Sequence, residues 1–263
     1  MERPTILVSN DDGVHAPGLV VLAQALREVG DVVVVAPERN WSAVGHTKTM
    51  HKPLRATQVA LPGAEGVVAY QSSGSPSDCV SLGLLGLAGR RVDLVVSGIN
   101  DGANVGTDLL YSGTFAAAAE AAIAGVPALA ISLDVGQYLN YRAAAAFAAG
   151  LARRALAAAA RQRPGERPWL LNVNVPDRPE GEVAGVQVTR LGTRVYQDAL
   201  VERFDPRGRR YYWIGGNVPT GLVEEGTDIG ALATGDISVT PVHLDLTDEE
   251  RIDELRAWAA RDG

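Results

Sequence analysis

Short apolar runs alternate with helical segments over the first two thirds of the chain, and this alternation constrains the fold more than any other feature. Apolar runs of this length, bounded by turn-forming residues, are typical of buried β-strands. They begin at Thr5, Asp31, Gly66, Asp93, Ala128 and Trp169. Because helices must cover the parallel strands, the pattern predicts an α/β fold with a doubly wound, mostly parallel, Rossmann-like sheet. The common strand order of such a sheet, counted along the chain, is 3-2-1-4-5-6.

Proline, serine and glycine residues mark the expected ends of several helices. A helix that opens at Pro17 is expected to end with Gly30 as its C-cap, and another begins at Ser75 or at the next residue. Further helices are predicted over Thr114–Gly125 and over the alanine-rich tract Ala143–Ala160. A glycine at every third position predicts close packing of the second helix on the sheet: Gly83, Gly86 and Gly89.

Beyond Pro176 the chain changes to short β-like runs. The runs RVYQDALVERFDP and RRYYWIGG are joined by turn-forming residues at Asp205–Gly208, which predicts a β-hairpin arm. Thr247 and Glu250 have the spacing of a capping box at the start of a last helix. We therefore expect a Rossmann-like domain over residues 1–180 and a C-terminal extension over residues 181–263 that contains the arm and the final helix.

The net charge of −7 and the pI near 5.2 limit the classes of partner. Broad binding to nucleic acid or to an anionic membrane needs a positive field over a whole face, so neither is expected. Cys79 is the single cysteine and no Cys/His cluster has zinc-site spacing, which favours a reducing cytoplasm. The first residues do not read as a signal peptide, and Gly150, Arg153 and Arg154 interrupt the only tract that resembles a membrane span.

The first strand runs directly into two acidic residues, in the sequence ILVSNDDG. Asp11 and Asp12 would lie at the carboxyl edge of the sheet, where open α/β sheets bind their ligands. Adjacent carboxylates repel each other unless a positive charge lies between them, and a divalent cation that prefers oxygen ligands is the usual solution. The sequence therefore predicts a metal site at this edge.

The expected strand order brings further polar loops to the same edge, because the crevice opens between strands 1 and 4 of the six main strands. Four segments are candidates to converge there: Asn10–Gly13, Asn40–Ser42, Asn100–Asn104 and Ser112–Thr114. Their carboxylate, hydroxyl and amide oxygens suit magnesium, manganese or calcium better than zinc or copper. The last segment begins a predicted helix, whose free amides favour an anion. A cation beside an anion site indicates a phosphate ligand.

Each of these features also has a simpler explanation. The two acids alone could form a turn and a helix cap, the glycine-rich stretch Gly98–Gly113 could be a flexible loop, and Ser42 could be an ordinary loop serine. His15 and His46 could be acid/base groups, but polar contacts are the simpler role. The segment RFDPRGRRYYW could be a nucleic-acid patch, although an arm used in oligomer contacts fits it better.

Two other protein classes lack their required residues here. A response-regulator receiver, which also places paired acids after its first strand, needs an acceptor aspartate after strand 3 and a lysine after strand 5. Strand 3 ends in QSSGS and strand 5 in SLD, with no lysine nearby. A dinucleotide-dependent dehydrogenase needs a G-x-G-x-x-G motif, and the chain contains no G-x-G.

Four ordered motifs closely resemble the survival protein E (SurE) family. They are NDDG after strand 1, ERNWSAVGHTKT after strand 2, VSGIND with GANVGTD after strand 4, and LLYSGTFAAAAEA leading into a helix. The resemblance implies a phosphatase that uses one divalent cation, Mg²⁺ or Mn²⁺, to hydrolyse nucleoside 5′-monophosphates, and in some members 3′-nucleotides or polyphosphate. It also implies a homodimer or homotetramer that exchanges C-terminal arms. Trp41 departs from the polar residue expected before the serine, which bears on loop shape or base preference.

The resemblance also assigns roles to individual residues. The implied metal ligands are Asp11, Asp12, Ser42 and Asn100. The positions implied to line the phosphate are Asn104, Ser112, Gly113 and Thr114. Asp11 and Asp12 are the implied catalytic residues, with either a water molecule or the Asp12 carboxylate attacking phosphorus. A non-catalytic sensor that binds metal and nucleotide on the same fold is the alternative function.

Overall fold

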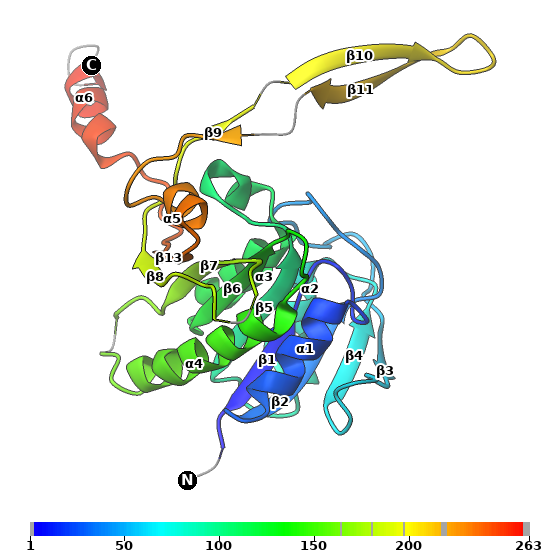
Figure 1. Cartoon of the computed structure of the whole chain (residues 1–263), viewed down its shortest axis with the longest axis vertical. Helices are drawn as coiled ribbons and strands as arrows, with labels where there is room; N and C mark the ends of the chain where they lie inside the picture. Colours follow the sequence, from blue (N-terminus) through cyan, green and yellow to red (C-terminus); the bar gives the residue numbers. More distant parts are fainter. Residues whose placement is uncertain (1–2, 164, 180, 197, 217–219, 260–263) are drawn as a thin grey trace.

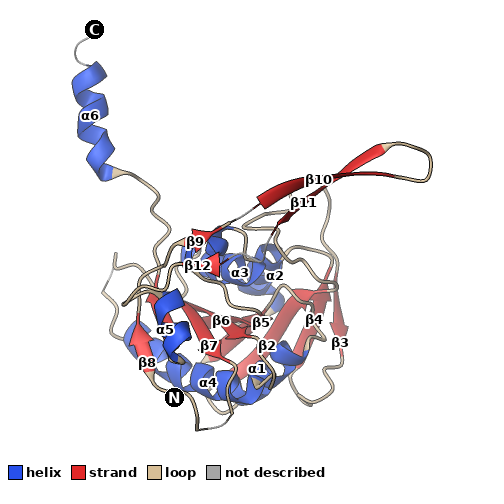
Figure 2. Ribbon diagram, turned by 45° about the horizontal axis from the view of Figure 1, so that its top comes forward, coloured by secondary structure: helices blue, strands red, loops and turns tan. Residues whose placement is uncertain are grey.

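Within the residues that the structure describes, nine strands form one sheet with helices on both faces (Figure 2). The computed structural model describes residues 3–163, 165–179, 181–196, 198–216 and 220–259. In chain order the strands of this sheet are β1 (Thr5–Ser9), β2 (Asp31–Pro37), β3 (Ala56–Val59), β4 (Val68–Ser72), β5 (Leu94–Asp101), β6 (Ala128–Asp134), β7 (Leu170–Pro176), β8 (Val186–Val188) and β13 (Ile237–Pro241).

The strands lie in the order β3-β4-β2-β1-β5-β6-β7-β13-β8. For the six main strands this is the predicted order 3-2-1-4-5-6, and these strands are all parallel. The winding reverses between β1 and β5, which are direct neighbours. The predicted α/β, doubly wound, mostly parallel sheet is therefore confirmed, and the crevice at its carboxyl edge opens between β1 and β5.

Two pairs of helices cover the sheet. On one face α1 packs with α4, and on the other α2 packs with α3, so that each face has its own apolar cluster. The helices are α1 (Pro17–Leu26), α2 (Pro76–Leu82), α3 (Gly113–Ile123), α4 (Tyr141–Ala159), α5 (Asp228–Thr234) and α6 (Glu249–Ala259), with a π-helical turn η1 (Gly83–Leu87) and a 3₁₀ turn η2 (Gly106–Leu110).

Burial on both faces explains the composition of the central strands. Every residue of β1 and of β7 is buried, as expected for parallel strands between two helix layers. The alanine-rich helix α4 turns a stripe of small side chains towards the sheet: Ala144, Ala145, Ala148, Ala149, Ala152 and Ala155. Their three- and four-residue spacing is that of one helix face, which lets the helix approach the strands closely.

Three local predictions from the sequence are wrong. Helix α1 ends at Leu26, so Gly30 is not its C-cap. Gly30 packs on the chain before β1, where a Cβ atom added to it would lie 2.3 Å from the carbonyl oxygen of Pro4. Gly83 does pack on the sheet, but the predicted packing of the two other glycines fails, because a Cβ atom added to either would meet no atom within 4 Å. The last helix is capped by Asp248 instead of Thr247, since Asp248 Oδ1 accepts a hydrogen bond from the Arg251 amide at 3.2 Å.

The segment after β7 has two parts with different surroundings. Strands β8 and β13 extend the main sheet, and α5, which the sequence did not predict, packs on β13. The strands β10 (Asp198–Phe204) and β11 (Arg210–Gly216) form the predicted antiparallel hairpin, which projects from the body of the molecule (Figure 1). A short pair, β9 (Arg194–Val195) and β12 (Thr220–Gly221), lies at its base.

The predicted domain boundary at residue 180 lies outside the described residues and stays a prediction. Among the helices that the structure describes, none combines the length and the apolar character that crossing a membrane requires.

Candidate functional site

The turn after β1 presents the paired acids at the sheet edge. Asn10 is fully buried, and its side-chain amide brackets the turn: Nδ2 donates to the Gly13 carbonyl at 2.9 Å and Oδ1 accepts from the Gly13 amide at 3.2 Å. Gly13 has φ +109°, a conformation that other residues rarely adopt. The backbone between these two residues is thus fixed, with Asp11 and Asp12 in the bend.

Asp11 is buried against the first turn of α3. Thr114 Oγ1 donates to Asp11 Oδ1, and a Cβ atom at Gly113 would lie 2.6 Å from the Asp11 Cβ, so only glycine fits there. Burial raises the pKa of Asp11, while the Thr114 hydroxyl and the amides of the helix terminus act in the opposite direction. In this structure the anion at the α3 N-terminus is therefore the Asp11 carboxylate itself.

Asp12 has a carboxylate oxygen that lacks a partner among the described residues. Its Oδ1 accepts a hydrogen bond from Asn40 Nδ2 at 3.1 Å, whereas its Oδ2 is buried and unpaired. Burial, followed by the negative charges of Asp11 and Asp101, raises the pKa of Asp12 to about 6. A buried carboxylate oxygen without a donor, next to two other acids, is the arrangement that a cation stabilises.

The loop after β2 reaches this pair through Asn40. Asn40 Oδ1 accepts hydrogen bonds from the Ser42 amide at 2.7 Å and from Ser42 Oγ at 2.6 Å, so one side chain connects Ser42 to Asp12. The backbone amide of Trp41 donates to the Asp11 carbonyl at 2.7 Å. The Arg39 guanidinium lies 4.9 Å from the centre of the Trp41 ring.

The following part of this loop is anchored to α3 through Glu120. His46 Nε2 lies 2.9 Å from Glu120 Oε2, and Lys48 Nζ lies 2.6 Å from Oε1, which also accepts a hydrogen bond from Ser81 Oγ at 2.8 Å. Although burial opposes it, these partners hold the pKa of Glu120 below its usual range. His46 is thus placed in a polar contact, the simpler of its two expected roles, and His15 is exposed.

The end of β5 contributes Asn100 and Asp101. The pairing of β5 with β6 shifts register between Ser97 and Asn100, which marks an irregularity of the bulge type before the polar residues. Asn100 Nδ2 donates to the Gly102 carbonyl at 2.8 Å. The Asp101 carboxylate accepts a hydrogen bond from the Tyr141 hydroxyl at 2.5 Å.

Asn104 and Ser112 lie on the loop between β5 and α3. The backbone of Asn104 is held by Asn172 and Asn174 of β7, at distances of 2.8–2.9 Å, and its Nδ2 donates to Ser132 Oγ at 3.0 Å. Ser112 is the N-cap of α3, where its Oγ accepts from the Phe115 amide at 3.0 Å. These contacts fix the positions of both residues, and their role in binding phosphate stays a prediction.

The structure thus joins most of the expected residues by direct contacts and adds three others. Asp11, Asp12, Ser42, Gly113 and Thr114 form one contact network, and Asn100 adjoins it through Asp101. Sequence reasoning named Asn40 and Asp101 as parts of converging loops without a role and did not name Tyr141, which pairs with Asp101 across 40 positions. Within the described residues no group of three or more His, Cys, Asp and Glu side chains could hold a metal ion, so a cation here needs hydroxyl and amide oxygens as well.

Comparisons with known proteins agree with this arrangement. The family described as "Survival protein SurE" matches residues 6–198. A 5′-nucleotidase SurE of Geobacter sulfurreducens is 53% identical over 254 residues, or 96% of this chain and 93% of that protein, and one of Chloroflexus aggregans is 51% identical over 96% of this chain and 98% of that protein. The crystal structure of SurE protein from Aquifex aeolicus, 36% identical, has a TM-score of 0.80 over 97% of this chain and 100% of that chain. Because these similarities span nearly the whole sequence, the chain belongs to the SurE family.

Proposed function

We propose that this chain is a metal-dependent phosphatase that hydrolyses nucleoside 5′-monophosphates to nucleoside and phosphate. The single observation that carries the proposal is the buried, unpaired Oδ2 of Asp12 beside Asp11 and Asp101. The activity named for the similar proteins of Geobacter sulfurreducens and Chloroflexus aggregans supports it. The same site would accept 3′-nucleotides if the phosphate and not the sugar determines binding.

The donor set fits one hard divalent cation, Mg²⁺ or Mn²⁺. Asp11 and Asp12 supply carboxylate oxygens, Ser42 a hydroxyl and Asn100 the amide oxygen that remains when its Nδ2 donates to Gly102. Oxygen donors of these kinds are the ligands that such cations prefer. When bound, the cation would offset the charge of the two acids and of the phosphoryl group.

The chain's own residues then have distinct tasks. Asp11, held by Thr114 and by the N-terminus of α3, provides a carboxylate whose position cannot change without moving the helix. Asp12 must be ionised whether it accepts the proton of an attacking water molecule at Oδ2 or itself attacks phosphorus. With a pKa of about 6 it is mostly ionised at pH 7.5. We propose that Asn104, Ser112, Gly113 and Thr114 line the phosphate end of the site.

The proposal is tested by phosphate release from a panel of 5′- and 3′-nucleotides with Mg²⁺, with Mn²⁺ and with EDTA. We expect turnover with one or both metals and none with EDTA. Nucleotide binding without phosphate release under any metal condition would contradict the proposal and favour the alternative of a non-catalytic metal and nucleotide sensor. In a single turnover in labelled water, isotope that appears in Asp12 would identify the carboxylate as the nucleophile.

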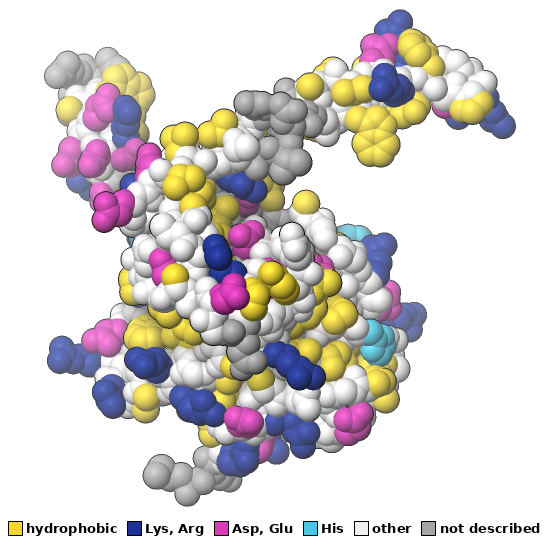
Figure 3. Space-filling model, viewed as in Figure 1, with side chains coloured by type: hydrophobic (Ala, Val, Ile, Leu, Met, Phe, Trp, Pro, Cys, Tyr) yellow, Lys and Arg dark blue, Asp and Glu magenta, His cyan; other side chains and the backbone are white. Residues whose placement is uncertain are grey.

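We further propose that the projecting hairpin packs on a second copy of the chain in a homodimer or homotetramer. Hydrophobic side chains lie exposed along the hairpin (Figure 3). Leu200 pairs with Ile214 across the hairpin, and both side chains are more than two-thirds exposed. An exposed apolar patch on a segment with no core of its own is typical of a protein interface.

A further inference from the structure

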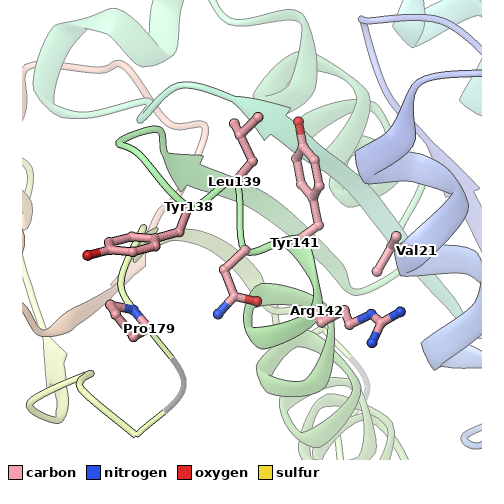
Figure 4. Close-up of a pocket in the computed structure, with 7 residues that line it drawn as sticks. Val21, Tyr138, Leu139, Tyr141, Arg142 and Pro179 are labelled. Atoms are coloured by element: carbon pink, nitrogen blue, oxygen red, sulfur yellow. The ribbon is translucent and has the colours of Figure 1, made fainter.

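A cavity lies between α1 and the start of α4, close to the acidic site. Its volume is about 370 Å³, within the range of pockets that bind small organic molecules. Tyr138 lies on the loop before α4, Tyr141 and Arg142 on the first turn of that helix, Val21 on α1, and Pro179 on the segment after β7 (Figure 4). The lining is therefore mainly aromatic and apolar, with one amide side chain, Asn140, and one cationic side chain.

This cavity adjoins the acidic site through Tyr141. The ring of Tyr141 lines the cavity, while its hydroxyl donates to Asp101 Oδ1 at 2.5 Å. Asp101 is one of the charges that raise the pKa of Asp12, so it lies close to the acid pair. A molecule with its phosphate at Asp11 and Asp12 would therefore have its next groups beside Tyr141.

The loop that presents Tyr138 is fixed by its backbone. The Asp177 carboxylate accepts hydrogen bonds of 2.8–3.0 Å from the amides of Gly136, Tyr138, Leu139 and Asn140. Although burial opposes it, these amides hold the pKa of Asp177 below its usual range. The Tyr138 side chain is nonetheless 57% exposed. An aromatic ring on an ordered backbone binds a flat ligand with little further loss of conformational entropy.

Arg142 adds a positive charge that nothing in the described part of the chain neutralises. Its side chain is exposed, and neither a hydrogen bond nor an ion pair is found for its guanidinium among the described residues. A planar guanidinium stacks on heteroaromatic rings and donates hydrogen bonds to ring carbonyl and nitrogen atoms. Its charge also favours an anionic substrate over a neutral one.

We propose that this cavity binds the base of the nucleotide whose phosphate lies at the paired acids, with Tyr138 contacting the ring on one side of Tyr141 and Arg142 lying on the other (Figure 4). This proposal rests on the proposed function. It assigns a binding site to the base, the part of the substrate that the acidic site does not contact. It predicts that the chain distinguishes nucleotides from other phosphate esters of the same sugar.

The test compares adenosine 5′-monophosphate with ribose 5-phosphate, which lacks only the base. We expect Tyr138→Ala to lower kcat/KM for the nucleotide about tenfold, mainly through KM, because a base stacked on an aromatic ring loses about that much binding on removal of the ring. For ribose 5-phosphate the change should stay below twofold. Tyr138→Phe should retain the wild-type preference, and Arg142→Ala should act in the same direction as Tyr138→Ala. Equal losses for both substrates, or no loss for either, would overturn the proposal.

Binding of adenosine, measured by titration calorimetry, separates this proposal from the proposed function. We expect wild-type protein to bind adenosine and Tyr138→Ala to bind it at least fivefold more weakly. If adenosine binds as expected but no phosphate is released from any nucleotide, the hydrolase proposal fails and the base site stands. If Tyr138→Ala binds adenosine as tightly as the wild type, the base site fails. Trp169→Ala, an exposed aromatic at the opposite edge of the sheet, is the matched control and should change neither measurement.

Discussion

The carboxyl edge of the sheet and the hairpin arm differ in how their side chains are satisfied. At the edge, Asp11 and Asn40 have partners within the same chain, and the buried Oδ2 of Asp12 is a charged atom that has none among the described residues. Along the arm, Leu200 and Ile214 contact each other across the hairpin but otherwise face outwards. The edge therefore presents buried polar atoms, whereas the arm presents exposed apolar side chains. Buried polar atoms of this kind indicate a small polar ligand, and an exposed apolar surface indicates another protein.

The largest expected effect is on nucleotide hydrolysis at the carboxyl edge of the sheet. Asp12→Asn should retain the fold but lower kcat for nucleotide hydrolysis by a factor on the order of 10²–10⁴, because the ionised oxygen is lost. Phosphate release at saturating metal, with circular dichroism as the fold check, measures this. Asp253→Asn, on exposed α6, is the control and should be fully active. Activity of Asp12→Asn within threefold of the wild type would contradict the assignment.

The neighbouring acid should affect the cation more than the reaction. Asp11→Asn should raise the metal concentration needed for half-maximal activity by at least about tenfold, since a neutral amide replaces a charged ligand that α3 holds in place. Metal titrations of activity and calorimetric metal binding both measure this change. The prediction is wrong if kcat at saturating metal falls as far as in Asp12→Asn.

For the arm, the expected effect is on assembly. Ile214→Asp should lower the mass measured by light scattering from that of an oligomer to that of a smaller species. Ile214 is 84% exposed in the single chain, and a charged residue at this position would be costly to bury in the proposed apolar interface. Leu85→Asp, at a position 87% exposed on η1, should leave the mass unchanged. A wild-type protein that remains monomeric at high concentration would exclude the proposed interface.

A smaller effect is expected where the loop after β2 meets α3. Glu120→Gln should lower the free energy of unfolding by about 1–3 kcal/mol, because His46 and Lys48 lose their buried charged partner. Hydrogen exchange in the loop should increase at the same time. Glu28→Gln, whose side chain is 78% exposed, is the control. Unchanged exchange in the loop would show that Glu120 does not anchor it.

The smallest expected effect is a pH-dependent stabilisation of metal-free protein. Since folding raises the pKa of Asp12 from 3.8 to about 6, the folded state holds this proton more tightly than the unfolded state. Its ionisation therefore destabilises the fold as pH rises from about 4 to above 6. In EDTA, Asp12→Asn should raise Tm by about 2–4 °C at pH 8, if roughly 1 kcal/mol remains after solvent screening. At pH 4 no difference is expected, and an equal gain at both pH values would contradict this cause.

The architecture of the edge was predictable because it follows from patterns along the chain. Apolar runs located the six main strands, and the confirmed strand order brought the end of β1 next to the end of β5. The strand order therefore predicts that Asp12 and Asp101, about ninety positions apart in the sequence, lie close together. The hairpin followed from its turn residues, which local chemistry determines.

Other features depend on contacts that no local pattern records. Helix α1 ends at Leu26, and Gly30 packs against Pro4 instead of capping the helix, a contact set by tertiary packing. Helix α5 spans only 7 residues, too few for a clear period. The Tyr141–Asp101 pair joins a helix start to a strand end, and neither sequence segment indicates the other.

Helix α3 contacts both sides of the acidic site. Its first turn receives Asp11, and Glu120, about two turns later, holds the loop that continues from Ser42. A small displacement of this helix would consequently carry one acid and the hydroxyl-bearing loop along together. Because the Asn10–Gly13 turn holds Asp11 beside Asp12, and Asn40 joins Ser42 to Asp12, the helix, the turn and the loop would move as one unit. The spacing of these oxygens would then be preserved when α3 moves.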